Sequence, residues 1–167
     1  FAYSNHTFYG TIMSNKISRQ YGLSNRKTQL ELDGVKRDKI EYRLDNLYYL
    51  KSSGAPYTGK VYELHPNGQK GYEGKYKDGL QEGLIVMWYE SGQKFREENY
   101  IDGEKEGLWG EWYPDGQKSW EASYKDGKVN GIWTRWHENG QKATEENYKD
   151  DELISAKYWN TKGELKK

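Results

Sequence analysis

Residues 116–139 read GQKSWEASYKDGKVNGIWTRWHEN, and this stretch is one copy of a unit that repeats along most of the chain. The Gly-Gln-Lys at its start recurs at Gly68, Gly92, Gly116 and Gly140, which gives three consecutive steps of 24 residues (92−68, 116−92, 140−116). A fixed period in this range is typical of repeat proteins, in which each unit buries its apolar side chains against its neighbours. The repeat therefore determines the fold.

Each unit is predicted to form two strands and two turns. The first strands are expected at residues 70–76, 94–100, 118–124 and 142–148, and the second strands at residues 84–89, 108–113 and 132–137. Asp-Gly and Asn-Gly between them are strong hairpin signals, because these residues tolerate the positive φ of tight turns. Short strands joined by tight turns pair with their sequence neighbours. We therefore expect an all-β fold, an elongated single array of antiparallel β-hairpins with about ten strands.

Four kinds of residue recur at fixed positions of the unit and should form ladders across the sheet. They are a Glu (Glu73, Glu97, Glu121, Glu145), a Tyr (Tyr76, Tyr100, Tyr124, Tyr148), a Gly (Gly59, Gly83, Gly107, Gly131) and a Trp (Trp88, Trp112, Trp136). If the turns at Ser91-Gly92 and its equivalents have two residues, the Trp ladder lies opposite Phe95, Ser119 and Ala143. The Tyr ladder then shares the other face with Ile85, Trp109 and Trp133, because side chains alternate between faces along a strand.

The repeat array is expected over residues 46–167, after a non-repeat N-terminal arm at residues 1–45. In the arm, residues 29–32 alternate polar with apolar and predict one short strand, and residues 36–43 predict a strand or a helical turn. The β-prone residues 47–50 and 60–64 flank a loop at residues 52–56 and are expected to form the first hairpin, a divergent copy. The last unit has Asp150-Asp151 in place of Asp-Gly and is expected to cap the array.

The composition excludes several classes of function. Among the 167 residues, 26 Lys and Arg balance 26 Asp and Glu, so the chain has no general attraction for nucleic acid or anionic membrane. A mean hydropathy of −1.21 is too polar for a thick globular core, but 16 Tyr, 7 Trp and 3 Phe supply enough apolar surface to order a thin structure. No apolar run approaches the roughly 20 residues that cross a bilayer. The absence of cysteine excludes disulfides and thiolate chemistry within these residues.

The sequence contains no recognisable catalytic, cofactor or metal motif. It has no cluster of metal-ligating residues, no phosphate-binding loop and no nucleophile elbow. The Glu ladder recurs once per unit, which favours a structural role, because a catalytic pair needs two different environments. His65 and His137 share a column with Tyr89 and Tyr113, and we expect them to replace an aromatic residue at a strand end. We therefore expect a non-enzymatic protein without cofactor or metal.

The aromatic side chains supply the candidate binding residues. The recurring Trp ladder is expected to pack within the structure. Residues that break the repeat are better candidates for binding a partner, and they are Tyr72, Trp109, Trp120, Trp133 and Arg135. Stacked aromatic rings bind proteins, sugars or choline-like cations. The alternatives are that these aromatics pack internally, and that the column holding Arg135 and Glu111 is a solvated face.

The unit pattern GQK…E…YKDG…G.W..WY.NG resembles the MORN-type repeat in its bacterial variant form. The resemblance runs from about residue 46 to residue 163 and includes the lead-in Pro56-Tyr57-Thr58-Gly59-Lys60-Val61. It implies a β-hairpin array that serves as a scaffold or a membrane-associated module. Bacterial variants are often described as antitoxin components of toxin–antitoxin systems, which implies a protein partner.

Three functions follow as hypotheses. The first is a protein–protein interaction module of the secreted space or cell envelope, which binds through the sheet face or the open edge strands. The second is an aromatic-ladder binder of cell-wall carbohydrate or choline. The third is a cytoplasmic antitoxin or immunity protein. Phe1-Ala2 resembles the small-residue end of a signal peptide, so we expect export, whereas an N-terminus without such a signal would favour the third hypothesis.

Overall fold

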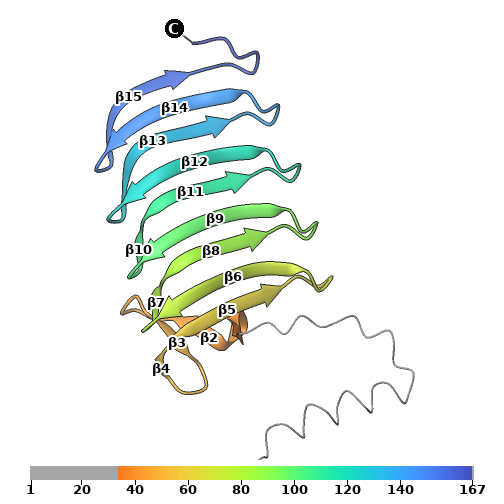
Figure 1. The fold of residues 1–167 in the computed structure, drawn as a ribbon, viewed down its shortest axis with the longest axis vertical. Coiled ribbons are helices and arrows are strands. Elements are labelled where there is room, and N and C mark those ends of the chain that lie inside the picture. Colours follow the sequence, from red (N-terminus) through yellow and green to blue (C-terminus); the bar gives the residue numbers. More distant parts are fainter. Residues whose placement is uncertain (1–33, 167) are drawn as a thin grey trace, which may run out of the picture. The chain divides into compact units, whose positions relative to one another are not determined.

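The computed structural model describes residues 34–166, which form an all-β unit (Figure 1). The strands of the repeat are β5 (Gly59–Leu64), β6 (Lys70–Lys77), β8 (Gly83–Trp88), β9 (Lys94–Ile101), β11 (Gly107–Trp112), β12 (Lys118–Lys125), β13 (Lys128–Trp136), β14 (Lys142–Lys149) and β15 (Glu152–Tyr158). Neighbours in this series pair antiparallel, in sequence order, within one 12-stranded sheet. The predicted hairpin array is therefore confirmed. No helix in this part of the chain is long and apolar enough to cross a membrane.

Shorter elements complete the unit. Two of them, β7 (Leu80–Gln81) and β10 (Glu104–Lys105), continue the long sheet beside β6 and β9. The N-terminal edge is covered by β1 (Val35–Lys36), which pairs parallel with β5 and is followed by the 3₁₀ turn η1 (Arg37–Lys39). A separate three-stranded sheet contains β2 (Ile40–Tyr42), β3 (Tyr48–Leu50) and β4 (Ala55–Pro56). Residues 36–43 thus contain both a helical turn and a strand, while the strand predicted at residues 29–32 lies outside the described residues.

The first hairpin predicted from residues 47–50 and 60–64 is wrong. The strand β3 pairs with β2 and β4, whereas β5 pairs with β1 and β6. The N–H of Tyr48 donates to the carbonyl of Gly79 at 2.8 Å, and the Tyr48 ring lies 4.7 Å from the ring of Tyr76. The contact between these two rings favours packing of β3 against the face of the long sheet over its addition to the edge of that sheet.

The Lys-Asp-Gly turns behave as predicted. In the first of them Asp78 has φ 49° and Gly79 has φ 83°. Positive φ at both central residues defines the type I′ turn, whose twist matches that of the flanking strands. In the last unit Asp150 and Asp151 take φ 52° and 69°, so an aspartate occupies the conformation that glycine has elsewhere.

The Gly-Gln-Lys turns differ from the prediction, but the pairing changes only at the tryptophan next to each turn. The N–H of Tyr89 donates to the carbonyl of Gln93, and the N–H of Gly92 donates to the carbonyl of Tyr89, so the loop has three residues. Only Gly92 has positive φ (84°), whereas a two-residue type I′ turn needs two such residues. A β-bulge follows, and Trp88 pairs with Lys94 instead of Phe95. Trp112 and Trp136 likewise pair with Lys118 and Lys142, not with Ser119 and Ala143.

The register divides the side chains of the long sheet between two faces. The aromatic face carries the following residues: Val61, Tyr72, Tyr76, Ile85, Met87, Arg96, Glu98, Tyr100, Trp109, Glu111, Trp120, Ala122, Tyr124, Trp133, Arg135, Thr144, Glu146 and Tyr148. The lysine–tryptophan face carries these: Lys70, Glu73, Leu84, Val86, Trp88, Lys94, Glu97, Leu108, Gly110, Trp112, Lys118, Glu121, Ile132, Thr134, Trp136, Lys142 and Glu145. The buried core follows the aromatic face. The Tyr ladder therefore shares its face with Ile85, Trp109 and Trp133, as predicted.

Successive units are joined by a side chain at the end of each second strand. The hydroxyls of Tyr89 and Tyr113 donate to the carbonyls of Trp112 and Trp136, at 2.7 and 2.8 Å. His65 and His137 place Nε2 at 2.7 and 3.2 Å from the carbonyls of Trp88 and Trp159. The prediction that histidine replaces an aromatic residue in this column is confirmed, and each of these side chains bonds to the following unit.

The bond between units predicts a measurable contribution to stability. Replacing Tyr113 with Phe keeps the ring but leaves the Trp136 carbonyl without its donor, which should lower the free energy of unfolding by about 1–2 kcal/mol. Urea denaturation followed by circular dichroism measures this loss. The exposed Tyr158, replaced in the same way, should change stability by less than about 0.5 kcal/mol. Equal losses in both variants would contradict a role for the bond.

The Tyr ladder predicts alkaline unfolding. Burial raises the pKa of Tyr72, Tyr76, Tyr100 and Tyr124 above the ordinary value of about 10. Ionisation of these tyrosines should leave the free energy of unfolding unchanged below about pH 10 and lower it above that pH. The reason is that the unfolded chain ionises them at a lower pH than the folded chain does. Tyrosinate absorbance and circular dichroism, recorded during one titration, should show the last tyrosines ionising as the sheet unfolds. Complete ionisation with an intact sheet would contradict the prediction.

Candidate functional site

The five predicted binding residues all lie on the aromatic face, but two of them are buried. Tyr72 and Trp109 are each only 2% exposed. The Tyr72 hydroxyl is 2.8 Å from that of Tyr76, and the indole N–H of Trp109 donates to the carbonyl of Asn99 at 3.0 Å. The other three candidates are partly or fully exposed and lie toward the C-terminal end of the array. They are Trp120, Trp133 and Arg135.

These three residues form a cluster because their strands are neighbours. Trp120 on β12 is directly opposite Arg135 on β13, and Arg135 is opposite Thr144 on β14. The ring centroids of Trp120 and Trp133 are 5.7 Å apart, and the Arg135 guanidinium carbon lies 4.9 Å from the Trp133 centroid. Tyr148 follows at 6.1 Å from Trp133. We call Trp120, Trp133, Arg135, Thr144 and Tyr148 the aromatic cluster.

The aromatic cluster contains two polar atoms whose bonding is incomplete. Within residues 34–166, the indole nitrogen of Trp133 and the hydroxyl of Thr144 are buried and have no hydrogen-bond partner. The indole of Trp109, one unit earlier, has the Asn99 carbonyl as its acceptor. Buried polar groups are bonded in the large majority of cases, so each exception requires an explanation. Because these two atoms are buried, the exposed Arg135 guanidinium is the group among the three that an incoming ligand can reach.

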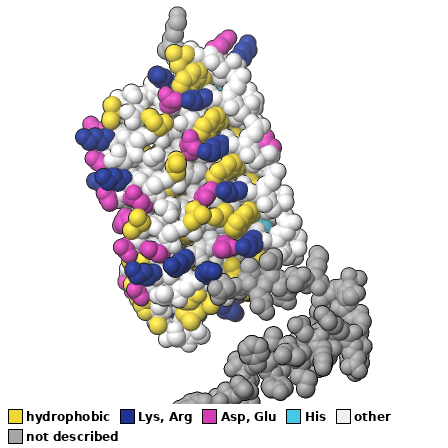
Figure 2. Space-filling view, in the orientation of Figure 1, with side chains coloured by type: hydrophobic (Ala, Val, Ile, Leu, Met, Phe, Trp, Pro, Cys, Tyr) yellow, Lys and Arg dark blue, Asp and Glu magenta, His cyan; other side chains and the backbone are white. Residues whose placement is uncertain are grey.

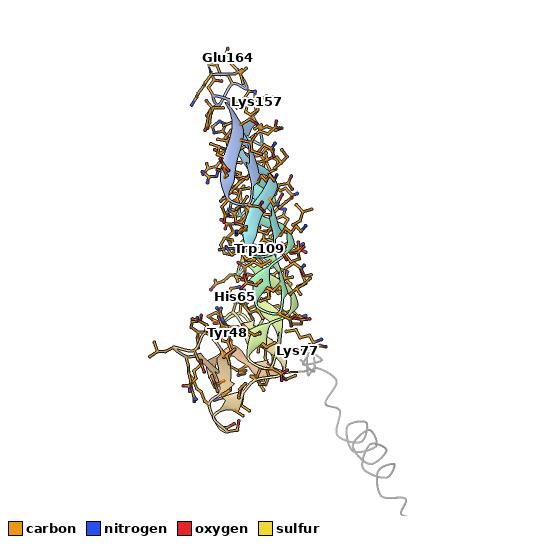
Figure 3. The ribbon with its side chains drawn as sticks, turned by 90° about the vertical axis from the view of Figure 1, so that its left-hand side faces the viewer. Tyr48, His65, Lys77, Trp109, Lys157 and Glu164 are labelled. Atoms are coloured by element: carbon orange, nitrogen blue, oxygen red, sulfur yellow. The ribbon has the colours of Figure 1, made fainter. Side chains whose placement is uncertain are left out.

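The N-terminal part of the aromatic face is covered by the preceding elements. Tyr48 of β3 packs on Tyr76, and Arg37 of η1 lies 4.4 Å above the ring of Tyr72. Seen along its edge, the long sheet carries the small sheet on one side, near β5 and β6 (Figure 3). The ring contacts of Trp120 and Trp133 are instead with other residues of the same face. The aromatic cluster is therefore the uncovered continuation of a surface that packs elsewhere.

A charged pair beside the cluster was missed by sequence reasoning. Arg96 Nε lies 2.8 Å from a carboxylate oxygen of Glu98, whose side chain is only 8% exposed. The Arg96 guanidinium carbon lies 6.0 Å from the ring of Trp109 and 5.7 Å from that of Trp120, and Tyr100 donates to Glu98 at 3.0 Å. The sequence did carry a signal for this pair. Arg96 takes the repeat position that is aromatic in Tyr72 and Trp120, and Glu98 takes the position that is small in Gly74 and Ala122.

This pair should be costly to break. Replacing Glu98 with Gln keeps the shape but leaves the guanidinium between two indoles without its counter-charge, which should cost about 2–4 kcal/mol of unfolding free energy. The double variant Arg96→Met/Glu98→Leu should lose less than Glu98→Gln, because it removes both charges together. Urea denaturation of the three proteins tests this order. An unchanged free energy of unfolding in Glu98→Gln would show that the pair does not stabilise the sheet.

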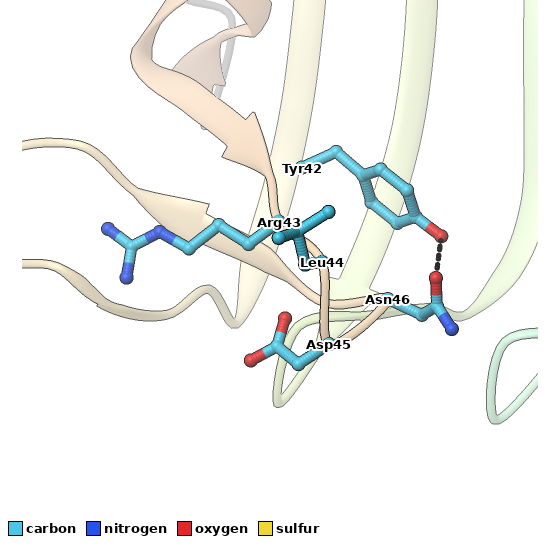
Figure 4. Close-up of a pocket in the computed structure, with 5 residues that line it drawn as sticks. All are labelled: Tyr42, Arg43, Leu44, Asp45 and Asn46. Atoms are coloured by element: carbon cyan, nitrogen blue, oxygen red, sulfur yellow. Dashed lines mark hydrogen bonds between the residues drawn. The ribbon is translucent and has the colours of Figure 1, made fainter.

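The loop between β2 and β3 borders an open surface hollow of a different kind. A volume of about 660 Å³ is lined by the consecutive residues 42–46, where the hydroxyl of Tyr42 donates to Asn46 at 2.8 Å (Figure 4). Leu44 is fully exposed, and Asp45 accepts a bond from the Tyr49 hydroxyl, which lowers the pKa of the carboxyl. Since one loop supplies the whole lining, this hollow lacks the convergence of elements that characterises a binding site.

The lysine–tryptophan face carries regular ion pairs. Each Glu of the ladder accepts a bond from the lysine three residues before it, such as Glu97 from Lys94 at 2.6 Å. The Lys94 ammonium also lies 4.9 Å from the centroid of Trp112. Each Glu of the ladder thus pairs with a lysine on its own strand, and Lys70 and Lys94 lie over the rings of Trp88 and Trp112. Basic, acidic and apolar side chains alternate along the molecule in Figure 2.

Comparison with known proteins supports the repeat. The family model for the MORN repeat variant matches residues 81–102 and 129–150, two stretches that start 48 residues, or two units, apart (129−81). Immunity protein YwqK of Bacillus subtilis (strain 168) is 58% identical over 31 residues, which are 19% of this chain and 20% of that protein. The matched stretch thus spans a small part of that relative.

Solved structures give a weaker likeness. A crystal structure of TarM aligns with 93% of this chain and 24% of its own, at 11% identity and a TM-score of 0.34. A mutant of S. aureus TarM aligns at 10% identity and a TM-score of 0.35. Scores of this size do not indicate a shared fold. The repeat itself is supported by both the sequence match and the hairpin register, and the chain contains two stretches that match the MORN repeat variant.

Proposed function

We propose that this chain is a non-enzymatic binding module that holds a protein partner on its aromatic cluster. The observation that carries the proposal is the contact of two tilted indoles with an exposed guanidinium where no described element covers the aromatic face. Trp, Tyr and Arg supply most of the binding energy at protein interfaces, because they combine large apolar area with polar groups. The cluster has this composition.

The polar atoms of the cluster define the chemistry of the partner. The exposed Arg135 guanidinium is a donor, whereas the Trp133 indole nitrogen and the Thr144 hydroxyl are buried beneath the surface. A partner that presents carboxylate or carbonyl oxygens would accept hydrogen bonds from this guanidinium while its apolar groups cover the indoles. Binding would then displace water from few polar groups, and most of the buried surface would be the apolar surface of the indoles.

The similarity to an immunity protein suggests the class of partner. We propose that the partner is a toxin protein whose activity is blocked by binding, and that the similarity over 31 residues reflects a shared scaffold for this purpose. Export to the secreted space or cell envelope remains our proposal for its location, with a cytoplasmic antitoxin as the alternative. Neither location alters the chemistry of the cluster.

A pull-down with matched baits tests the proposed function. The variant Trp133→Phe/Arg135→Glu keeps an aromatic ring in the stack and reverses one exposed charge, whereas Ile132→Ala changes the neighbouring residue of β13 on the lysine–tryptophan face. We expect wild type and Ile132→Ala to retain the same protein from fractionated source cells. The cluster variant should bind the purified partner at least about tenfold more weakly, by calorimetry.

Two results would contradict the proposal. One is equal affinity of the cluster variant and wild type for the recovered protein. The other is the failure of wild type to retain any protein from either the envelope or the cytoplasmic fraction. The fraction that yields the partner distinguishes the two proposed locations.

A further inference from the structure

The middle row of the lysine–tryptophan face alternates glutamates with a second series of residues. Val86 is directly opposite Glu73 on one side and Glu97 on the other, and Thr134 is flanked in the same way by Glu121 and Glu145. A β-branched side chain thus fills the space between two carboxylates. In the unit between them this position is Gly110, which is opposite Glu97 and Glu121 and has no side chain.

The missing side chain leaves a hollow of about 250 Å³ above Gly110. Trp112 and Leu108, two residues away along β11, form its ends, and the flanking strands supply Glu97 on one side and Glu121 with Lys118 on the other. A Cβ placed on Gly110 would lie 3.2 Å from Cη2 of Trp112, so the indole leans over the glycine. Residues from three strands therefore converge on this hollow.

The charges around the hollow cancel. Lys94 donates to Glu97 at 2.6 Å, and Lys118 is paired with Glu121. A cationic ligand placed between the two carboxylates would meet two ammonium groups as well, and an anionic ligand would meet two carboxylates. Electrostatics therefore favours a neutral ligand, since neither sign of charge gains a net attraction.

The rim also disfavours a purely apolar ligand. The four charged side chains are partly exposed, with 28–43% of their side-chain surface accessible, and an apolar group would displace their water without replacing its hydrogen bonds. A ring that carries several hydroxyls can donate to the carboxylates and accept from the ammonium groups. Its apolar C–H face can lie on the indole.

We propose that the hollow above Gly110 binds one neutral sugar ring. Trp112, whose ring is partly covered by Lys94, supplies its remaining exposed indole surface, Glu97 and Glu121 accept hydrogen bonds from ring hydroxyls, and Lys118 donates one. A free saccharide and a residue of a longer glycan present the same chemistry. This site lies on the face opposite the aromatic cluster and does not depend on a protein partner.

Saccharide titrations test the site with defined probes. D-glucose, D-galactose and N-acetyl-D-glucosamine are each added to the ¹⁵N-labelled chain, and a chitin or glucan oligosaccharide is added separately. At least one monosaccharide should shift the Trp112 indole resonance with a Kd of about 1–10 mM, as expected for a ligand of about a dozen heavy atoms. An oligosaccharide that binds more tightly would indicate a glycan as the source of the ring.

Variants of the middle row provide matched controls. Gly110→Val introduces the residue that Val86 has in the preceding unit, so the strand should be retained while the hollow is filled and binding is lost. Thr134→Val makes a similar change in the row without touching the hollow and should bind as wild type. Val86→Gly should open a second hollow and add a shift at Trp88. Glu121→Gln, which changes no volume, should weaken binding by about tenfold through loss of a charge-assisted bond.

Three outcomes would overturn the proposal. They are no shift with any saccharide, an unchanged shift in both Gly110→Val and Glu121→Gln, and a shift with N-acetyl-arginine amide but with no sugar. The last result would assign the hollow to a basic side chain of a protein. Circular dichroism melting of each variant confirms that the sheet is intact, and Glu121→Gln decides the result if Gly110→Val fails to fold.

Discussion

The structure depends on the difference between its two kinds of turn. Each Lys-Asp-Gly turn places two consecutive residues at positive φ, whereas each Gly-Gln-Lys turn places only one there and is followed by a bulge. A one-residue change of register moves every side chain of a strand to the opposite face. The turns therefore determine which residues share the aromatic face, which lysines lie over tryptophans, and which residue lies between two glutamates.

The sequence predicts the parts of the fold that repeat. The period, the strand positions, the type I′ turns and the face shared by Tyr76, Ile85 and Trp109 all follow from residue spacing. The three-residue loop was missed because Ser91-Gly92 resembles a two-residue turn, and only the φ of Ser91 distinguishes them. The first hairpin was wrong because a β-prone segment does not reveal its partner, and the burial of Tyr48 against Tyr76 is a contact between distant residues.

The candidate sites arise where the repeat is interrupted. Spacing alone selected Trp120, Trp133 and Arg135, but it selected the buried Tyr72 and Trp109 with equal weight. Tyr72 lies under Arg37 of η1, which is outside the repeat, whereas Trp109 packs against Tyr100 and Tyr124 of the repeat itself. The Arg96–Glu98 pair and the hollow above Gly110 also come from departures within single columns. A residue that departs from its repeat position can therefore be interpreted only when the residues that contact it in the fold are known.

The hydrogen bonds between units have a consequence for the length of the molecule. Tyr89 bonds to the unit that follows it, and His65 makes the same kind of contact one unit earlier. Because donor and acceptor are supplied in every unit, an in-frame duplication or deletion of 24 residues would restore the same bond at the new junction and leave both faces in phase. The array can thus be lengthened or shortened by whole units while the packing between units stays the same. A binding site that arises by substitution in one unit can then be duplicated at a fixed spacing.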